Sequence, residues 1–279
     1  MGWNSWCTDS LCNAAGKDPC SDEMVRSIAD AIVDEGMDKL GYRYVSLDDC
    51  WSAKTRNASG HLQADPASFP HGMAAVADYV HSKGLKFGLY TCVGTKTCKG
   101  GRPGSYGHFD RDASTLAAWG VDLVKMDHCT SPKNETDEKL YGDMGAALNA
   151  TGRPILFSLC SWGGQAVWEW GAKTAQMFRI AQDHFPLWTL PHQNPNQGGY
   201  GSGVRDIIEW MAHLQPSLWT KQYVGRERVC VVCVECCAAA RCSSAVRCTW
   251  CSHKAVTCIR GTETIPNTLP LRLRQIRLA

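Results

Sequence analysis

The stretch GVDLVKMDHC, residues 120–129, decides the fold predicted for this chain. Its apolar run at 121–124 has the length and the β-branched content of a buried strand. Lys125, Asp127 and His128 follow the run, so charged side chains gather where the predicted strand leaves the core. Parallel α/β folds hold their functional groups at such strand ends.

Segments typical of helices and of strands alternate on both sides of this stretch. Further strands are predicted at residues 42–47, 85–90, 155–159 and 176–180. Helices are predicted at 21–41, with Ser21 as the cap and Gly41 at the end, and at 74–83, 112–119, 135–149 and 204–214. The alternation indicates an α/β fold with a parallel sheet, which is either doubly wound or a closed (β/α)8 barrel.

Polar residues at the strand ends distinguish these two folds. In a barrel all strands end at one mouth, whereas an open sheet gathers only the residues beside its switch point. The glycine-rich phosphate motif of many open sheets is absent, because the glycine pairs at 100–101 and 198–199 lack its spacing. We therefore predict a TIM barrel that is incomplete, with about six βα units. The polar residues at its strand ends are Asp48, Asp49, Tyr90, Lys125, Asp127, Cys160, Ser161, Trp162, Arg179 and Asp183.

Two of these carboxylates suggest a chemistry. Opposed carboxyl groups carry out glycoside hydrolysis, in which one attacks the anomeric carbon and the other protonates the leaving oxygen. Lys125 shares a strand face with Asp127 and favours its ionised form. Taken alone, Asp127 is equally well explained as a helix cap or as a partner of Lys125. Asp183, after a different strand, makes the hydrolase interpretation the better one. Sugar recognition would use acceptors and aromatic surfaces at Trp6, Asp48, Asp49, Trp51, Tyr90 and Trp162.

The composition divides the chain into two parts. Residues 218–279 hold 10 Lys and Arg against 3 Asp and Glu, which leaves 19 against 24 for residues 1–217. Eight of the 16 cysteines lie in each part. The cysteines and the glycosylation motifs at Asn57, Asn134 and Asn149 favour a secreted or lysosomal protein of the secretory pathway. We recognise no signal peptide and no apolar run of about 18 residues, and expect no membrane segment.

Four motifs occur in a specific order: MGWNSW at 1–6, LDDCW at 47–51, the stretch from KFGLYTC to the opening motif at 86–129, and SLCSWG at 158–163. Together they resemble the α-galactosidase (melibiase) family of retaining glycosidases, glycoside hydrolase family 27, over residues 1–217. The resemblance implies a catalytic (β/α)8 barrel, which in family members precedes a β-sandwich domain. It also implies hydrolysis of terminal α-galactosides with no cofactor and no metal.

The resemblance assigns roles to individual residues. Asp127 becomes the nucleophile that forms a covalent glycosyl-enzyme, and Asp183, four residues after Arg179, becomes the acid/base. The two carboxyl groups are then expected about 5 to 5.5 Å apart. The sugar hydroxyls would be held by Asp48, Asp49 and Lys125, with Trp6 and Tyr90 lining the pocket and Arg179 near the 2-position.

The same resemblance predicts two disulfides. Cys98 and Cys129 match a bond that supports the nucleophile strand. Cys50 is expected to pair with a cysteine of the first loop, for which Cys12 is preferred over Cys7 and Cys20.

Substrate preference depends on Cys160 and Trp162. In plant-like family members the matching residues crowd the 2-position of the sugar, which favours galactose over N-acetylgalactosamine. Ser161 stands where those members have Glu. The alternatives are α-N-acetylgalactosaminidase activity and an inactive remnant that binds sugar at most.

The family pattern stops after Tyr223. A seventh strand with a Trp-x-Asp-Pro-Asp motif is expected there, and the sequence lacks it. Residues 218–279 are interpreted as non-family sequence, irregular or disordered. The alternative is a zinc module formed by two Cys-x-x-Cys pairs, at 230–233 and 248–251. The basic tail lacks a recognisable nucleic-acid module, so we expect a galactoside and no nucleic acid as the partner.

Overall fold

The computed structural model describes residues 1–6, 20–99, 101–183, 187–189, 203–214, 246–249 and 257–260. The chain divides into two compact units, Met1–Val232 and Cys233–Ala279. The second unit contains β7 (Val246–Thr249) and β8 (Thr257–Arg260), which form an antiparallel pair. The zinc alternative and the interpretation of the tail as irregular depend mostly on residues outside the described ones.

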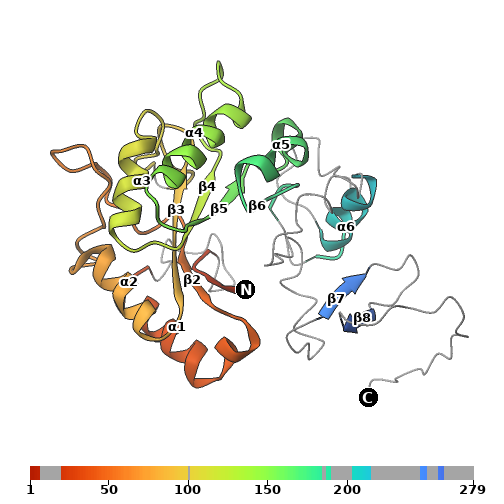
Figure 1. The fold of residues 1–279 in the computed structure, drawn as a ribbon. Helices are drawn as coiled ribbons and strands as arrows, with labels where there is room; N and C mark the ends of the chain where they lie inside the picture. The colour runs from red at the N-terminus through yellow and green to blue at the C-terminus, as the bar shows by residue number, and fades with distance from the viewer. Residues whose placement is uncertain are drawn as a thin grey trace, which may run out of the picture. The chain divides into compact units, whose positions relative to one another are not determined.

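The first unit alternates strands and helices in the predicted manner (Figure 1). The elements in chain order are β1 (Gly2–Asn4), α1 (Asp22–Asp34), the 3₁₀ helix η1 (Met37–Leu40), β2 (Tyr44–Leu47), α2 (Gly72–Ser82), β3 (Lys86–Cys92), α3 (Phe109–Ala118), β4 (Leu123–Asp127), α4 (Asp137–Ala150), β5 (Leu156–Cys160), the 3₁₀ helix η2 (Gly164–Ala166), α5 (Val167–Thr174), β6 (Met177–Phe178) and α6 (Val204–His213).

The sheet has the strand order of a barrel. Six strands pair in the order β1-β2-β3-β4-β5-β6, and every pair is parallel. A doubly wound sheet reverses its strand order at a switch point, whereas a barrel adds each strand beside the preceding one. The prediction of an incomplete (β/α)8 barrel is therefore confirmed. Among the described strands, β1 and β6 each pair along one edge only.

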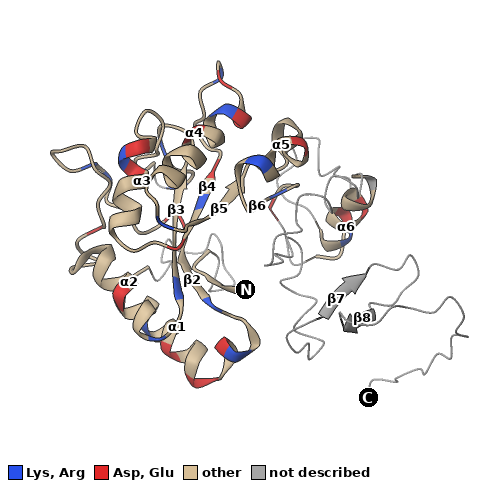
Figure 2. Ribbon diagram, viewed as in Figure 1, with Lys and Arg blue, Asp and Glu red and all other residues tan. Residues whose placement is uncertain are grey.

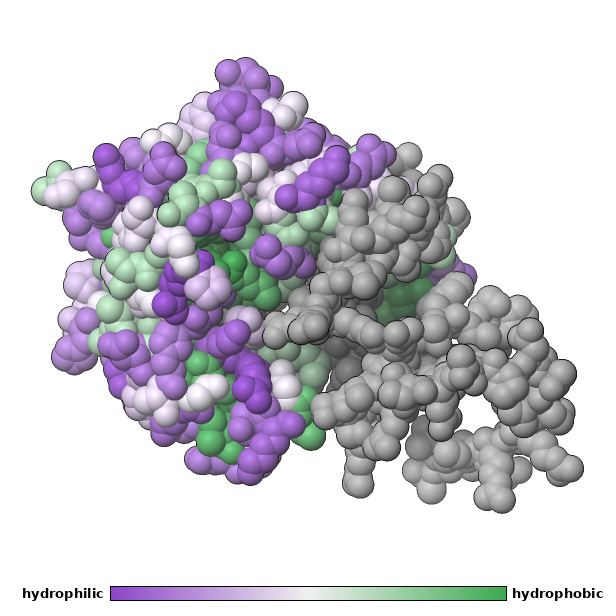
Figure 3. Space-filling model, viewed as in Figure 1, coloured by the Kyte–Doolittle hydropathy of each residue, from purple (hydrophilic) through white to green (hydrophobic). Residues whose placement is uncertain are grey.

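The two faces of the sheet differ in chemistry. The face that carries Val45, Leu89 and Val124 is completely buried beneath the helices. The opposite face carries polar and charged side chains on the same strands, such as Tyr90 and Lys125. Charged residues therefore occur on β4 as well as on the helices (Figure 2). Hydrophilic residues cover much of the molecular face in Figure 3, with smaller hydrophobic patches between them.

Several boundaries differ from the predicted ones. The helix predicted at 21–41 is two elements, because Gly36 adopts a left-handed conformation with φ 68° and separates α1 from η1. The strand predicted at 121–124 lies at Leu123–Asp127, so that Lys125 and Asp127 belong to β4 itself. No sequence pattern predicted α5, whose eight residues directly follow η2. Ser21 caps α1 as predicted, since its side chain accepts a hydrogen bond from the Met24 N–H.

Two disulfides are formed in the described part of the chain. Cys98 is bonded to Cys129, as the resemblance implied. Cys50 is bonded to Cys20, so the preferred pairing with Cys12 was wrong. Cys20 directly precedes the Ser21 cap, and the start of α1 brings it to the end of β2, with 6.0 Å between the Cα atoms of the bonded pair. No helix among the described residues is long and apolar enough to span a bilayer.

Peptide mapping without reduction tests this pairing. Mass spectrometry is expected to recover Cys20 linked to Cys50 and Cys98 linked to Cys129. Cys50→Ser should lower the free energy of unfolding by about 2–4 kcal/mol, because the bond restrains the unfolded chain. Cys92→Ser is the control, since it removes a buried thiol and leaves both disulfides intact. A peptide that joins Cys12 to Cys50 would contradict the structure.

Candidate active site

Strand register brings the predicted site residues together in two rows on the polar face of the sheet. Tyr90 on β3, Lys125 on β4 and Ser158 on β5 are register partners. Two residues further along the same strands, Cys92, Asp127 and Cys160 form the second row. Side chains two residues apart share a face of a strand, so both rows point to the same side. The second row lies at the carboxyl end of the sheet, and we call this end, with the residues that follow the strands, the mouth.

An ion pair connects β2 with β4 inside this polar face. Lys125 Nζ lies 2.7 Å from Asp48 Oδ2, and Asp48 is only 2% exposed. The Asp48 N–H donates to Ser5 Oγ at 2.8 Å, which fixes the end of β2 against the residues that follow β1. Burial alone would lower the pKa of Lys125, but the Asp48 carboxylate, followed by Cys160 and Asp127, raises it above its usual value. The ammonium is therefore charged and aimed at the acidic groups of the mouth.

Among the described residues, Asp49 has no ion pair like the one between Asp48 and Lys125. Its Oδ2 accepts the Lys99 N–H, while its Oδ1 is buried and has no hydrogen-bond partner in the described part of the chain. Burial raises the pKa of the Asp49 carboxyl to about 6, and the hydrogen bonds from Lys99 and Thr97 only partly oppose this effect. A buried oxygen without a donor is uncommon in a folded protein, because burial removes the water that would otherwise bond to it.

Aromatic side chains lie beside the ammonium group of Lys125. Its Nζ is 5.3 Å from the centre of the Tyr90 ring and 6.0 Å from that of the Trp6 ring. Trp6 is 39% exposed, which leaves indole surface open to a ligand. Trp51 is buried in the core and donates its indole N–H to the Tyr90 carbonyl at 2.9 Å. Trp51 thus supports Tyr90 from behind and does not line the mouth.

Asp127 ends β4 in a rigid setting. Its Oδ1 accepts the His128 N–H at 2.9 Å, and the residue is 7% exposed. The disulfide of Cys129 lies two residues further on, and the Cys92 thiol donates to the Cys129 carbonyl at 2.9 Å. The sulfurs of Cys98 and Cys129 come near the Asp127 carboxylate, but they are joined to each other and cannot serve as thiolate ligands for a metal.

Arg179 connects the second row with Asp183. Its Nη1 lies 3.2 Å from Cys160 Sγ and 2.6 Å from Asp183 Oδ1. Burial raises the pKa of the Cys160 thiol to about 11, although Arg179 and Lys125 oppose the shift, so the thiol is neutral. The Asp183 side chain is 62% exposed, in contrast to the buried Asp127. The expected separation of the two carboxyl groups stays a prediction.

Trp162 follows β5 in an unusual backbone conformation. Its φ is 55°, in the left-handed region that non-glycine residues rarely adopt. Its indole ring packs edge-on against the His128 ring, with 5.6 Å between the ring centres. His128 belongs to the motif at residues 120–129, but the sequence alone indicated no role for it. Ser5 was also missed, although it lies inside the MGWNSW motif.

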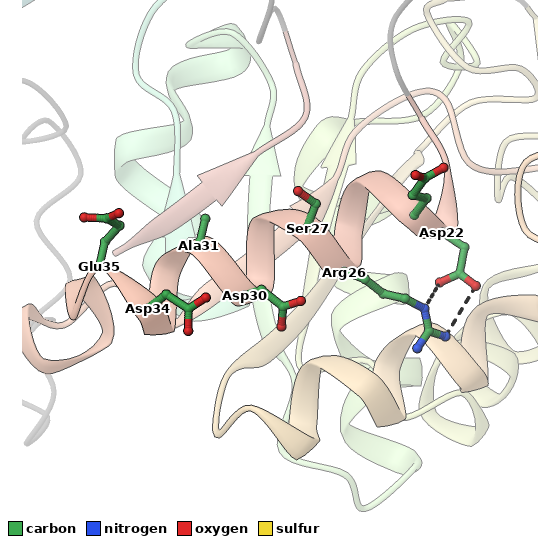
Figure 4. A pocket seen from close by; sticks show the side chains of 8 residues that line it. Asp22, Arg26, Ser27, Asp30, Ala31, Asp34 and Glu35 are labelled. Carbon is green, nitrogen blue, oxygen red and sulfur yellow. Dashed lines mark hydrogen bonds and ion pairs between the residues drawn. The ribbon is translucent and has the colours of Figure 1, made fainter.

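A shallow hollow lies apart from this mouth, along α1 (Figure 4). Its volume is about 730 Å³, and its lining comes from α1 and the Glu35 cap that ends this helix. Arg26 and Asp22 pair across it at 2.6 Å. The opposite side of α1, with Val25 and Ala29, faces the core, so the hollow lies on the outer surface. The lining residues are Asp22, Glu23, Arg26, Ser27, Asp30, Ala31, Asp34 and Glu35.

The fold and the mouth define a class. This is a parallel α/β-barrel protein. The carboxyl ends of its strands carry buried acids, a lysine that forms an ion pair with one of them, and aromatic side chains. The family model for alpha galactosidase A of the melibiase type matches residues 1–227, and the chain belongs to that family. The four sequence motifs had indicated this family, and the indication is confirmed.

Individual relatives agree with the family model. Alpha-galactosidase A of Cellvibrio japonicus is 44% identical over 216 residues, which are 77% of this chain and 50% of that protein. Human alpha-galactosidase A is 48% identical over 200 residues, 70% of this chain and 41% of the human one. The chain thus spans about half the length of the curated relatives it matches.

Solved structures show the same relationship. Alpha-galactosidase I of Mortierella vinacea superposes with a TM-score of 0.68 at 37% identity, covering 75% of this chain and 53% of that one. The alpha-galactosidase of Saccharomyces cerevisiae, solved with raffinose, gives a TM-score of 0.67 at 33% identity and covers 75% and 47%.

The raised pKa of Asp49 predicts how stability depends on pH. Between about pH 4 and pH 6 the folded protein keeps a proton that the unfolded chain has released. The stabilising contribution of Asp49 is therefore full below about pH 4 and is lost as the pH rises through about 6. From pH 4 to pH 7 the wild type should lose about 2–3 kcal/mol relative to Asp49→Asn. Urea unfolding across this range measures the difference.

The exposed Asp110 provides the matched control for this measurement. Asp110→Asn should keep the pH dependence of the wild type. Equal slopes for Asp49→Asn and the wild type would show that Asp49 titrates normally in the folded protein.

Proposed function

We propose that this protein is a retaining glycosidase that hydrolyses terminal, non-reducing α-D-galactosides. The observation that carries the proposal is the family match over residues 1–227, which includes both proposed acids and the whole polar row at the strand ends. The yeast relative solved with raffinose supports a galactoside as the ligand of this mouth. No cofactor or metal takes part in the proposed reaction.

The proposed mechanism has two displacement steps. In the first, the Asp127 carboxylate attacks the anomeric carbon while the bond to the leaving oxygen breaks, and Asp183 gives its proton to that oxygen. This yields a glycosyl ester on Asp127. In the second step Asp183 removes a proton from water, the water oxygen attacks the anomeric carbon, and the ester bond breaks. Two inversions release galactose with its original anomeric configuration.

The surrounding residues would bind the sugar. Asp48, Asp49 and Lys125 would offer two carboxylates and an ammonium to the hydroxyl groups. Trp6 and Tyr90 would lie against the apolar side of the ring. The disulfide Cys98–Cys129 would hold Asp127 in place during both steps.

We infer a preference for galactose over N-acetylgalactosamine. Cys160 and Trp162 would occupy the space beside the 2-position, where Arg179 approaches Cys160 at 3.2 Å. A hydroxyl group fits beside these side chains, whereas an acetamido group would collide with them. We further propose that residues 1–217 form the catalytic unit and that the protein enters the secretory pathway, which the two disulfides support.

Substitution of the two acids tests the proposal with an aryl α-galactoside. Asp127→Asn should lower kcat by at least about 10³-fold, because it removes the nucleophile. Asp183→Asn should lower it by about 10²- to 10⁴-fold, which is the usual contribution of a general acid. Asp110→Asn, on the exposed surface of α3, should leave kcat unchanged.

The stereochemical outcome is measured separately by NMR of the first product formed. Retention of the α configuration supports the two-step mechanism, and inversion rejects it. If the chain binds galactose in calorimetry but releases no aryl alcohol, the alternative of an inactive sugar-binding remnant replaces the proposal.

A further inference from the structure

The loop between β5 and α5 is held in a conformation that its own residues do not favour. Trp162, Gln165 and Ala166 have φ values of 55°, 47° and 51°, and none of them is glycine. Left-handed backbone of this kind persists only where surrounding contacts hold it. The contacts that hold this loop therefore control where the Trp162 indole lies.

Asp137 at the start of α4 is the centre of those contacts. Its Oδ1 lies 2.6 Å from His128 Nε2, and its own N–H donates to Gln165 Oε1 at 3.0 Å. The Asp137 side chain is 3% exposed and the His128 side chain 25%. His128 in turn places its ring against Trp162 at 5.6 Å. Asp137 thus contacts both ends of the loop, through its backbone N–H at Gln165 and through its buried carboxylate and His128 at Trp162.

Two other interpretations of the contact between His128 and Asp137 account for fewer of the observed contacts. Ser131 Oγ lies 3.4 Å from His128 Nε2, which suggests a serine, histidine and aspartate triad. A triad uses the two ring nitrogens for its two partners, whereas here the same Nε2 faces both Ser131 and Asp137. Asp137 also suits the positive end of the α4 dipole, but this does not account for the ring contact between His128 and Trp162.

We propose that His128 and Asp137 are positioning residues that hold Trp162 beside the 2-position of the sugar and so set the preference for galactose. This inference rests on the proposed function and assigns to His128 the role that the opening motif left unexplained. Neither residue needs to touch the substrate. Their effect on specificity passes through the indole ring.

Kinetics with two substrates tests the proposal. His128→Ala should lower the ratio of kcat/KM for the aryl α-galactoside to that for the aryl α-N-acetylgalactosaminide by about tenfold, the effect expected when one wall of a pocket loosens. Trp162→Ala should lower the same ratio at least as much. The double variant should show no further decrease, because His128 acts through Trp162. His108→Ala, at the start of α3, is the matched control and should keep the wild-type ratio.

Additive effects in the double variant, or an unchanged ratio in His128→Ala, would overturn the proposal. His128→Phe keeps an aromatic ring but loses the contact with Asp137, and it should fall between the wild type and His128→Ala. If His128→Ala does not fold, His128→Phe provides the test in its place.

A readout that needs no turnover separates this proposal from the proposed function. The protein is labelled with 5-fluorotryptophan, and the ¹⁹F resonance of Trp162 is assigned by its loss in Trp162→Phe. His128→Ala and Asp137→Asn should both shift that resonance, and His108→Ala should not. An unmoved resonance overturns the positioning role even in an active enzyme. If the resonance shifts but the protein shows no turnover, the positioning role is supported and the proposed function fails.

Discussion

The site depends first on the in-register parallel pairing of β3, β4 and β5. Pairing of Tyr90 with Lys125 and of Cys92 with Asp127 gives every polar side chain of β4 a neighbour at the same height. A slip of one residue would turn Lys125 and Asp127 towards the helices and Val124 and Met126 towards the mouth. Val124 and Met126 are completely buried on the helical side, so their burial opposes such a slip. The hydrophobic core thus fixes the register, and the register fixes the chemistry.

The mouth concentrates polar groups at a cost in stability. Asp48 and Lys125 are taken out of water together, and their contact at 2.7 Å compensates for part of the lost hydration. Asp49 lacks such compensation, which is why burial dominates its pKa. The loop after β5 adds backbone strain at Trp162. These unfavourable features lie at or near the carboxyl ends of the strands, while the helical face of the sheet contributes the apolar core that stabilises the fold. Their arrangement is typical of a binding site.

Much of this could be predicted from the sequence, because short strands and amphipathic helices leave clear patterns. The alternation and the barrel order followed from those patterns, and the family followed from four motifs. The exact span of β4 did not, because Leu123-Val-Lys-Met-Asp127 alternates between the two faces and its polar half looked like the end of a strand. The partner of Cys50 was also missed, since only the position of α1 selects Cys20. The contact between His128 and Trp162 joins two loops 34 residues apart, and no local pattern encodes it.

The parts of the site differ in how firmly the fold holds them. Asp48 directly follows β2 and Lys125 lies on β4, and both strands have paired neighbours on both sides in the described sheet. Asp183 instead follows β6, a strand of two residues that pairs along one edge there, and its side chain is largely exposed. An unpaired edge leaves backbone groups without partners, and a closed barrel removes this weakness. The family's Trp-x-Asp-Pro-Asp motif, which would contact the sugar, has no counterpart after Tyr223. Under the proposed function, sugar binding through β2 to β4 would therefore depend less on closure of the barrel than turnover would, because turnover would also require Asp183 to be held opposite Asp127.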